Sequence, residues 1–559
     1  MFRTGLLHIL SKPIFQAMIV FSAILAVATP IYEQVDDVWM LRMMSGSYTG
    51  EPSSYAYYLN IVLSSLMAQL FRMHSGINWY TLFLYGSLFL SFYAICIVFS
   101  RIKHVVLFSI PSALVTILIY GYAMTHIQYV LIAGLCAVSG MVLILNAWHR
   151  SVPMRREYIV AFVLIVISYM LRERATDFIL LLALPIAAHA FPRIQKGHKR
   201  LAKVFIVTTG VTLVVLYAVQ MVAYNLNPQF VTEKPWNDLQ GNVSAYQIYN
   251  YRLHPDIYQS VGWSENDYQM FDSTSYEDPN VFSFSDLRRI VHDSIRQLPT
   301  TKQLEYFRAI AFFNVSQTGG MYLLTAYILF AGYLVWFNKE RKLLLISFAL
   351  FIGGYTYYSY LIRIMPYRVT LPIALFFTVY PLIFSEENRK PSLKKKLGLY
   401  GIFVTSFLVL AIKEGYREVQ LNEERIRRFQ KVLTMIPKKD TAVVYLWNTS
   451  IPFYWTSPFD STVGLKEYAF ISGGWPQRLT PDRRVYEQYG VKNIYQDFLT
   501  KDNLLMIAND ERLLLYKKYM DEHYKITVGF HVLRDYSSYE LEKDRYGFGG
   551  KLVKPYRIY

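Results

Sequence analysis

Two adjacent carboxylates, Asp36 and Asp37, directly follow the first apolar stretch of the chain, which runs from Pro13 to Tyr32. Two like charges beside hydrocarbon repel one another and resist desolvation, so the pair is costly where it stands. A carboxylate in such a place can take a proton from an incoming hydroxyl group. The pair therefore indicates a catalytic or substrate-binding site, while the alternative is that one Asp only caps a helix.

Four arginines beside other apolar stretches could bind a phosphate: Arg172, Arg174, Arg363 and Arg368. A guanidinium group donates two parallel hydrogen bonds to phosphate oxygens, which suits the phosphate of a lipid-linked substrate. The alternative is that these side chains only reach lipid headgroups. Glu51 is a candidate contact for a sugar or an ion, although its Gly-Glu-Pro setting is equally typical of a turn. Trp263, in the segment GWSENDY, could stack on a sugar.

Long apolar blocks must position these residues. The chain has 559 residues, 53% of them hydrophobic and 16% aromatic. Charge-poor runs of about 17 to 24 residues recur, close to the length that crosses ~30 Å of hydrocarbon. They predict about eleven transmembrane spans, of which the fifth is shorter than the others, near residues 13–32, 79–100, 104–121, 127–148, 158–171, 176–192, 204–224, 321–337, 343–362, 370–385 and 397–413.

The charges between the spans predict an orientation. If the N-terminus is cytoplasmic, the clusters of Lys and Arg fall in alternate short loops, as they do on the cytoplasmic side of membrane proteins. The apolar, Tyr-rich segment 55–71 would reverse this pattern if it crossed the membrane, so we interpret it as a helix lying at the outer interface. Asp36, Asp37 and the four arginines then share the outer side.

Net charge and cysteine content bear on two other classes, nucleic-acid-binding proteins and proteins with a disulfide framework or a Cys-based metal site. The formal net charge is +17, but much of the excess lies in the predicted inner loops, where it orients the protein and meets anionic membrane lipids. There is no nucleic-acid motif, and we expect no nucleic-acid partner. Both cysteines, Cys96 and Cys136, fall inside predicted spans, so neither a disulfide framework nor a Cys-based metal site is indicated.

The predicted fold is an α-helical polytopic membrane protein with a small C-terminal extracytoplasmic α/β domain. Residues 1–413 form the transmembrane module, with a first outer loop at 33–78 and a large outer helical loop at 225–320 that includes helices at 285–296 and 301–313. Residues 414–559 follow, with a strand at 441–447 and a helix at 510–524. Parity places the large loop and the C-terminal domain on the same outer side.

The block VDDVWMLRMMSGSYTGEP, residues 35–52, and the later NWY, residues 78–80, resemble the first outer loop of the bacterial GT-C superfamily. These are polyprenyl-phosphate-dependent membrane glycosyltransferases with a similar arrangement of spans and outer segments. The resemblance implies a GT-C-like module in a bacterial inner membrane and a polyprenyl-phosphate-linked sugar as donor. It also implies a glycan or lipid-linked acceptor on the outer face, with Asp36 or Asp37 as the catalytic base.

The predicted reaction is a single displacement at the anomeric carbon of the sugar, which inverts its configuration. A divalent cation, Mg²⁺ or Mn²⁺, could bridge an Asp to the phosphate but is not required. One alternative is a polymerase or ligase that acts on lipid-linked oligosaccharides. Another is a lipid or polysaccharide flippase-type transporter, although ion-coupled transport usually needs charges within the spans, and here their central parts contain almost none.

Overall fold

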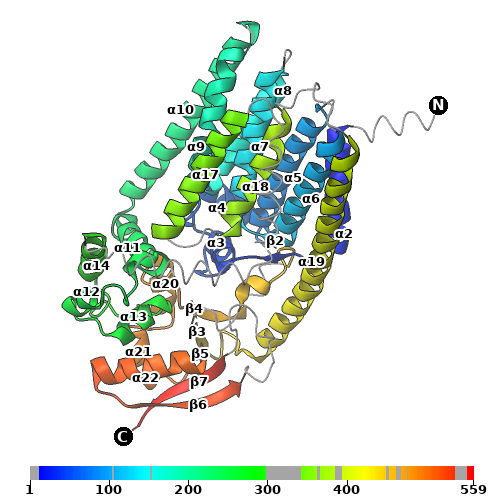
Figure 1. Cartoon of the computed structure of the whole chain (residues 1–559). Helices are drawn as coiled ribbons and strands as arrows, with labels where there is room; N and C mark the ends of the chain where they lie inside the picture. Colours follow the sequence, from blue (N-terminus) through cyan, green and yellow to red (C-terminus); the bar gives the residue numbers. More distant parts are fainter. Residues whose placement is uncertain are drawn as a thin grey trace.

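The computed structural model describes residues 12–102, 106–150, 154–194, 196–296, 341–361, 366–383, 393–447, 452–460, 467–474, 476–535 and 550–558. The chain is mostly helical. Long helices form a bundle, and shorter helices and a five-stranded sheet gather at one end of it (Figure 1). We call this the loop end of the bundle.

The bundle consists of α2 (Pro13–Val27), α5 (Trp79–Phe99), α6 (Val106–Thr125), α7 (Tyr129–His149), α8 (Arg155–Leu171), α9 (Glu173–Ala190), α10 (Lys196–Leu226), α17 (Arg341–Leu361), α18 (Tyr367–Ile383) and α19 (Leu393–Met435). Each predicted span within the described residues overlaps one of these helices, and the span predicted at 321–337 lies outside the described residues. By length and composition, four described segments can cross a membrane: Trp79–Phe99, Tyr129–His149, Glu173–Arg193 and His198–Leu226. A total of eleven crossings stays a prediction.

Helix α7 is the centre of the bundle. Nearly all of its side chains are buried, and it packs against α5, α8, α9 and α18. A Cβ atom at Gly134 would lie 2.5 Å from Cγ of Pro372, so glycine lets α7 and α18 approach closely. The start of α7 is fixed by Gln128, whose side chain accepts a hydrogen bond from the backbone N–H of Leu131.

Two short strands join the first loop to the start of α7. Strand β1 (Ile31–Tyr32) pairs in parallel with β2 (His126–Ile127). Helix α3 (Val35–Ser45) follows β1, and α4 (Ile61–Met73) occupies part of the segment predicted as an interfacial helix. Asn60 sets the start of α4 by accepting a hydrogen bond from the N–H of Val62. The pairing therefore fixes where α3 leaves the bundle.

Local sequence explains where α3 begins and ends. Asp36 and Asp37 lie in its first turn, where carboxylates favour the positive end of the helix dipole. The helix ends at Gly46, whose φ of 72° is left-handed, and a Cβ atom there would lie 2.6 Å from the backbone carbon of Glu51. Only glycine fits this turn without strain. Figure 1 shows α3 between the bundle and the elements of the loop end.

The described part of the segment after α10, up to Arg296, is largely helical. It contains α11 (Pro228–Ala245), the 3-10 turn η2 (Gln247–Tyr249), α12 (Pro255–Ser260), α13 (Glu265–Asp272) and α14 (Phe284–Arg296). Helix α14 is the helix that the sequence predicts at 285–296. The helix predicted at 301–313 lies outside the described residues.

The C-terminal part of the chain contains a mixed sheet with strand order β4-β3-β5-β7-β6. Its strands are β3 (Val443–Leu446), β4 (Ala469–Ser472), β5 (Leu504–Ala508), β6 (Val528–Asp535) and β7 (Lys551–Arg557), and its helices are α20 (Thr480–Gln488), α21 (Ile494–Thr500) and α22 (Asp510–Tyr524). Strands β4, β3 and β5 are parallel, and β7 runs antiparallel to β5 and β6. Strand β3 and helix α22 lie where the sequence predicts a strand and a helix.

The two long segments lie together at the loop end, as parity predicts (Figure 1). Helix α13 packs against α22, and the Ser275 hydroxyl lies 3.0 Å from that of Tyr495. Helix α19 continues unbroken from the bundle to Met435, so the boundary predicted between residues 413 and 414 falls inside one helix. Which side of the membrane the loop end faces stays a prediction.

Candidate active site

Helix α3 places Asp37 against the bundle. The Asp37 side chain is completely buried, and its Oδ1 accepts hydrogen bonds from the Tyr80 hydroxyl at 2.9 Å and the Tyr129 backbone N–H at 3.1 Å. Its Oδ2 has no hydrogen-bond partner among the described residues. Burial raises the pKa of Asp37 well above its ordinary value, and the hydrogen bond from Tyr80 opposes this only in part.

Asp36, the preceding residue, is only partly buried and lies near Arg172. It interacts electrostatically with Arg172, Tyr58 and Tyr129. Arg172 occupies the turn between α8 and α9, and its guanidinium carbon lies 5.4 Å from the centre of the Tyr58 ring. The Tyr58 ring in turn stacks on that of Tyr129, with 6.4 Å between centroids. The fold thus brings together a carboxylate and an arginine that are 136 positions apart in the sequence.

The surroundings of Arg172 leave its pKa above the ordinary value. Burial by itself lowers the pKa of the Arg172 guanidinium, but its neighbours Tyr129, Tyr58, Glu173 and Asp36 outweigh burial. A fixed positive charge beside a carboxylate can bind an anionic group while the carboxylate accepts a proton.

Glu33 brings a second arginine to the same region. Its backbone N–H donates to the carbonyl of Ile127 at 2.9 Å, which extends the pairing of β1 and β2. Its side chain interacts electrostatically with Arg368, near the start of α18, and with His126. Burial raises the pKa of Glu33 above its ordinary value, although the neighbouring His126 and Arg368 oppose this. Arg368 also interacts with Tyr129, so both arginines approach the same tyrosine.

His126 connects strand β2 to helix α19. It is buried, its ring stacks on Tyr122 at 4.6 Å, and its Nε2 lies 3.4 Å from Oε2 of Glu418 in α19. Burial raises the pKa of Glu418, but the hydrogen bond with His126 and the nearby His126, Arg425 and Arg417 side chains bring it below its ordinary value. The contact between His126 and Glu418 ties β2 to α19.

Two of the predicted site residues are exposed in the described structure, and a third is enclosed. The side chains of Glu51 and Arg174 are exposed, and the backbone of Glu51 forms the turn against Gly46. Trp263 is only 2% exposed, and its Nε1 donates to the carbonyl of Val281 at 2.8 Å. Its ring packs inside an aromatic cluster of the loop end, with Tyr258, Phe271 and Phe282. A sugar cannot stack on a ring that is enclosed in this way.

Arg363, the remaining predicted site residue, lies outside the described residues. Of the other predicted residues, the structure brings together Asp36, Asp37, Arg172 and Arg368 around Tyr129. The tyrosines of this group were missed by the sequence analysis. Tyr80 belongs to the NWY segment that carried the resemblance, but Tyr58 and Tyr129 stand in Tyr-rich apolar sequence with no local signal.

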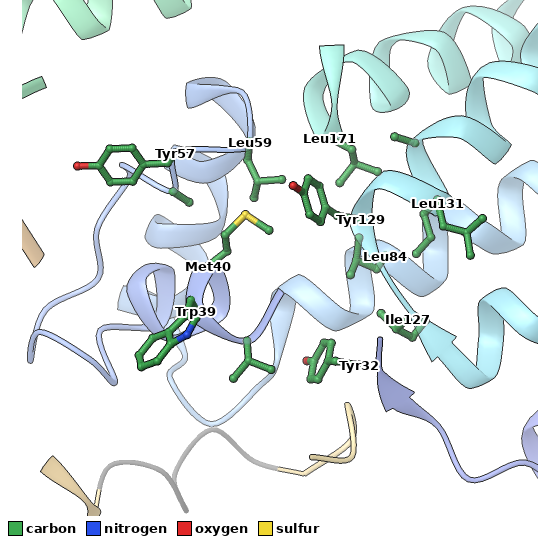
Figure 2. Packing of buried hydrophobic residues seen from close by; sticks show 14 of the residues in the cluster. Tyr32, Trp39, Met40, Tyr57, Leu59, Leu84, Ile127, Tyr129, Leu131 and Leu171 are labelled. Carbon is green, nitrogen blue, oxygen red and sulfur yellow. The ribbon is translucent and has the colours of Figure 1, made fainter. Parts of the chain in front are cut away.

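The opposite end of α3 also buries a charge. Arg42 is 2% exposed, and its guanidinium carbon lies 4.8 Å from the Trp39 ring centre and 5.0 Å from that of Tyr48. Its Nε and Nη1 have no hydrogen-bond partner among the described residues. Burial lowers the pKa of Arg42 to about 10. Figure 2 shows that Trp39 points away from Met40, which lies with Leu59 on the side of α3 that faces Tyr129.

Carboxylates of the loop end face Arg42. Asp482 of α20 is completely buried and accepts a hydrogen bond from the Tyr48 hydroxyl. Burial, and then the charge of Glu277, raise the pKa of Asp482 well above its ordinary value. Burial likewise raises the pKa of Glu277 to about 7, although Arg478 lowers it. This group, which we call the α3–α20 joint, connects α3 to both long segments.

Metal-binding geometry occurs elsewhere in the described residues. The group of His, Asp or Glu side chains close enough to share an ion there is Asp267, Glu522 and His523, at the contact of α13 and α22. Asp36 and Asp37 do not form such a group with described residues. The geometry therefore gives no support to the predicted Mg²⁺ or Mn²⁺ at these two carboxylates.

Comparison with known proteins gives limited information. No family model and no curated protein matches this chain. Two solved structures resemble it: ArnT from Cupriavidus metallidurans in the apo state, with 10% identity and a TM-score of 0.41, and the same protein bound to undecaprenyl phosphate, with 9% identity and a TM-score of 0.40. Each alignment covers 99% of this chain and 98% of the other. A likeness at this level carries no argument about activity.

Proposed function

We propose that this chain is an integral membrane glycosyltransferase of the GT-C type, which transfers a sugar from a polyprenyl-phosphate donor to a glycan or lipid-linked acceptor. The observation that carries the proposal is the convergence of Asp36, Arg172 and Arg368 around Tyr129. These groups come from α3, the turn after α8, and α18. Their chemistry matches what the reaction needs, namely a proton acceptor and cations for a phosphate. The resemblance of residues 35–52 to GT-C proteins points the same way.

Asp36 is the proposed proton acceptor, and Asp37 the residue that positions it. Asp36 is partly exposed and lies by Arg172, so an acceptor hydroxyl can approach it. Asp37 is fully buried, and its Oδ1 is held by Tyr80 and Tyr129. Its raised pKa favours the neutral form, which suits an anchor for α3 better than a proton acceptor.

The two arginines are proposed to bind the departing phosphate. In the transfer, the acceptor oxygen forms a bond to the anomeric carbon, and the bond between that carbon and the phosphate oxygen breaks. Asp36 takes the hydroxyl proton, and polyprenyl phosphate leaves with the bonding electrons. Arg172 and Arg368 stabilise its negative charge. One displacement inverts the configuration, and no step in this proposal passes through a metal ion.

A transfer assay in reconstituted vesicles tests the proposal. The purified protein is mixed with a panel of polyprenyl-phosphate-linked radiolabelled hexoses and pentoses and with a bacterial envelope lipid extract as acceptor. We expect label in the acceptor and one polyprenyl phosphate released per sugar, with inverted configuration in the product. Transfer of whole oligosaccharides would favour a ligase. Movement of intact donor across the bilayer without bond cleavage would contradict a transferase.

The matched variants are Asp36→Asn and Asp256→Asn. Asp256 is an exposed Asp in the first turn of α12, so its substitution removes the same charge from the same kind of helix position, away from the site. We expect Asp36→Asn to lower the rate by at least about 100-fold, as the loss of a general base usually does. Asp256→Asn should transfer as the natural protein does. Equal rates in both variants would remove the proposed base.

A further inference from the structure

Three side chains that can bind a metal meet where the two long segments of the loop end touch. Asp267 lies in α13, and Glu522 and His523 lie near the end of α22, about 250 positions later in the chain. Their ligand atoms are all within 4.8 Å of one another. Asp267 is buried, Glu522 is partly exposed and His523 is exposed. The group therefore has a buried wall and a side from which an ion can enter.

Hydrogen bonds within the group explain part of this arrangement. Nε2 of His523 lies 2.7 Å from Oδ1 of Asp267, and Oδ2 of Asp267 accepts from the Ser264 N–H at 2.8 Å. Oε2 of Glu522 accepts from the Ser264 hydroxyl at 3.1 Å. These contacts cap α13 and hold it to α22, so a purely structural ion pair would account for them.

A neighbouring amide is not explained by these hydrogen bonds. Asn266 is 1% exposed, and its Oδ1 has no hydrogen-bond partner among the described residues. The same amide group faces the cluster, because its Nδ2 lies 3.3 Å from Oε2 of Glu522. A buried carbonyl oxygen without a donor is uncommon and often marks an unfilled water or ion position. Its Nδ2 also lies 3.4 Å from the carbonyl oxygen of Leu515, so two acceptors hold the amide with its nitrogen toward the group.

We propose that Asp267, Glu522 and His523 bind a divalent transition-metal ion of the Zn²⁺ class, with water as the fourth ligand. One imidazole nitrogen with two carboxylate oxygens is a donor set that suits Zn²⁺, whereas Mg²⁺ prefers oxygen ligands alone. Ligand bonds of ~2.0 to 2.2 Å place tetrahedral ligand atoms about 3.3 Å apart. The nitrogen and oxygen of His523 and Asp267 therefore need to separate only slightly, and the proton between them leaves.

The ion would fasten α13 to α22 and so hold the large loop against the C-terminal sheet. This consequence is independent of the proposed transferase activity, because the contacts of these three residues within the described part of the chain lie at the loop end and not around Tyr129. It predicts that the ion stabilises the folded chain by binding to it, with a melting temperature that rises as the ion concentration increases.

Metal titration of the purified full-length protein, in detergent and freed of tag and of metal by EDTA, tests this site. With ZnCl₂ as the probe, we expect one ion bound per chain by elemental analysis and a rise in melting temperature. MgCl₂ at the same concentration should give no rise. No bound zinc, or an equal rise with Mg²⁺, would overturn the assignment.

The variants His523→Gln and His292→Gln separate this site from adventitious binding. His292 lies in α14 with its Nδ1 2.9 Å from Asp293, so it is an exposed His–Asp pair without the other two ligands. We expect His523→Gln to lose the bound zinc and the rise in melting temperature, and His292→Gln to keep both. If His523→Gln fails to fold, Glu522→Gln serves instead and should weaken zinc binding at least tenfold. Unchanged zinc binding in whichever of these variants folds would overturn the proposal.

Discussion

The two ends of α3 bury opposite charges in different surroundings. The first turn presents Asp36 and Asp37 to the bundle, and the last turn presents Arg42 to the sheet and the large loop. Both ends contain a buried atom with no hydrogen-bond partner among the described residues, Oδ2 of Asp37 and Nε of Arg42. Such atoms are expensive, because each has lost its contacts with water without a replacement.

The difference between the ends lies in access. Beside Asp37 stand the partly exposed Asp36 and Arg172, whereas Arg42 is enclosed by aromatic rings and faces the completely buried Asp482. The first group therefore includes side chains that are partly exposed, whereas Arg42 and Asp482 of the second group are both buried. A buried charge without a hydrogen-bond partner therefore indicates a ligand-binding site only where a neighbouring charged residue is partly exposed. We interpret the second group as a structural joint.

The largest expected effect is on the joint. Replacing Arg42→Ala removes the cation that faces Asp482 and leaves a space between Trp39 and Tyr48. Loss of one member of a buried charge group costs about 3 to 5 kcal/mol. We expect a fall of this size in the free energy of unfolding, measured by denaturant titration in mixed micelles. Arg72→Ala, an exposed arginine on α4, is the control. Equal free energies of unfolding for both variants would show that the α3–α20 joint does not stabilise the fold.

The second effect is on catalysis. Arg172→Lys keeps the charge but loses the forked geometry that holds a phosphate with two hydrogen bonds. We expect about a 100-fold lower rate of sugar transfer, comparable to removing one donor from a charge-stabilising site. Arg174→Lys, in the same turn but with an exposed side chain, should lose less. A larger loss of transfer rate for Arg174→Lys than for Arg172→Lys would indicate that the phosphate binds at the more exposed Arg174.

The third effect concerns the pH dependence of stability. The folded chain holds the Glu277 proton up to a pKa of about 7, against 4.5 ordinarily. Ionisation therefore opposes folding, so stability falls as pH rises between these values and is level above them. Glu277→Gln should flatten this slope and be more stable than the natural chain at pH 8, as measured by thermal unfolding. The exposed Glu487→Gln is the control, and parallel curves for all three proteins would refute this ionisation effect.

The smallest effect is a single hydrogen bond. Tyr80→Phe removes the hydroxyl that donates to Asp37, which should cost about 1 kcal/mol of stability. It should also raise the pKa of Asp37 further, because that hydrogen bond lowers it. Tyr85→Phe removes a similar bond from the same helix, from Tyr85 to the carbonyl of Met124. Only the Tyr80 variant should change the pH profile of transfer. Identical pH profiles of transfer for Tyr80→Phe and the natural protein would show that Asp37 does not affect catalysis.

Much of the fold was predictable because its signals are local. Apolar runs located the helices of the bundle, and the basic loops placed the two long segments at one end, where the structure has them. The pattern at 285–296 predicted α14. The sequence also indicates a charged helical stretch from Glu414 to Leu433, and α19 ends close by at Met435. The continuity of this stretch with the span before it was not predictable, because helix-forming residues give no signal of whether two neighbouring helical segments are joined.

The site was only partly predictable. Charge and position singled out Asp36, Asp37, Arg172 and Arg368, which the structure brings together. The contribution of Tyr129 depends on a two-residue strand pairing between segments about 95 positions apart, which local sequence cannot show. Trp263 was predicted to contact a sugar but is buried. An aromatic residue beside polar residues gives the same sequence pattern whether its ring is exposed or enclosed.

The most direct test of the account compares the initial transfer rates of Asp36→Asn and Asp37→Asn, each checked for folding by thermal unfolding. The Asn that replaces Asp37 can still accept hydrogen bonds from Tyr80 and Tyr129, so this variant should keep most of its structure and a measurable rate. We predict that Asp36→Asn is slower than the natural protein by at least about 100-fold and slower than Asp37→Asn. A folded Asp36→Asn that transfers sugar at the natural rate would contradict the account.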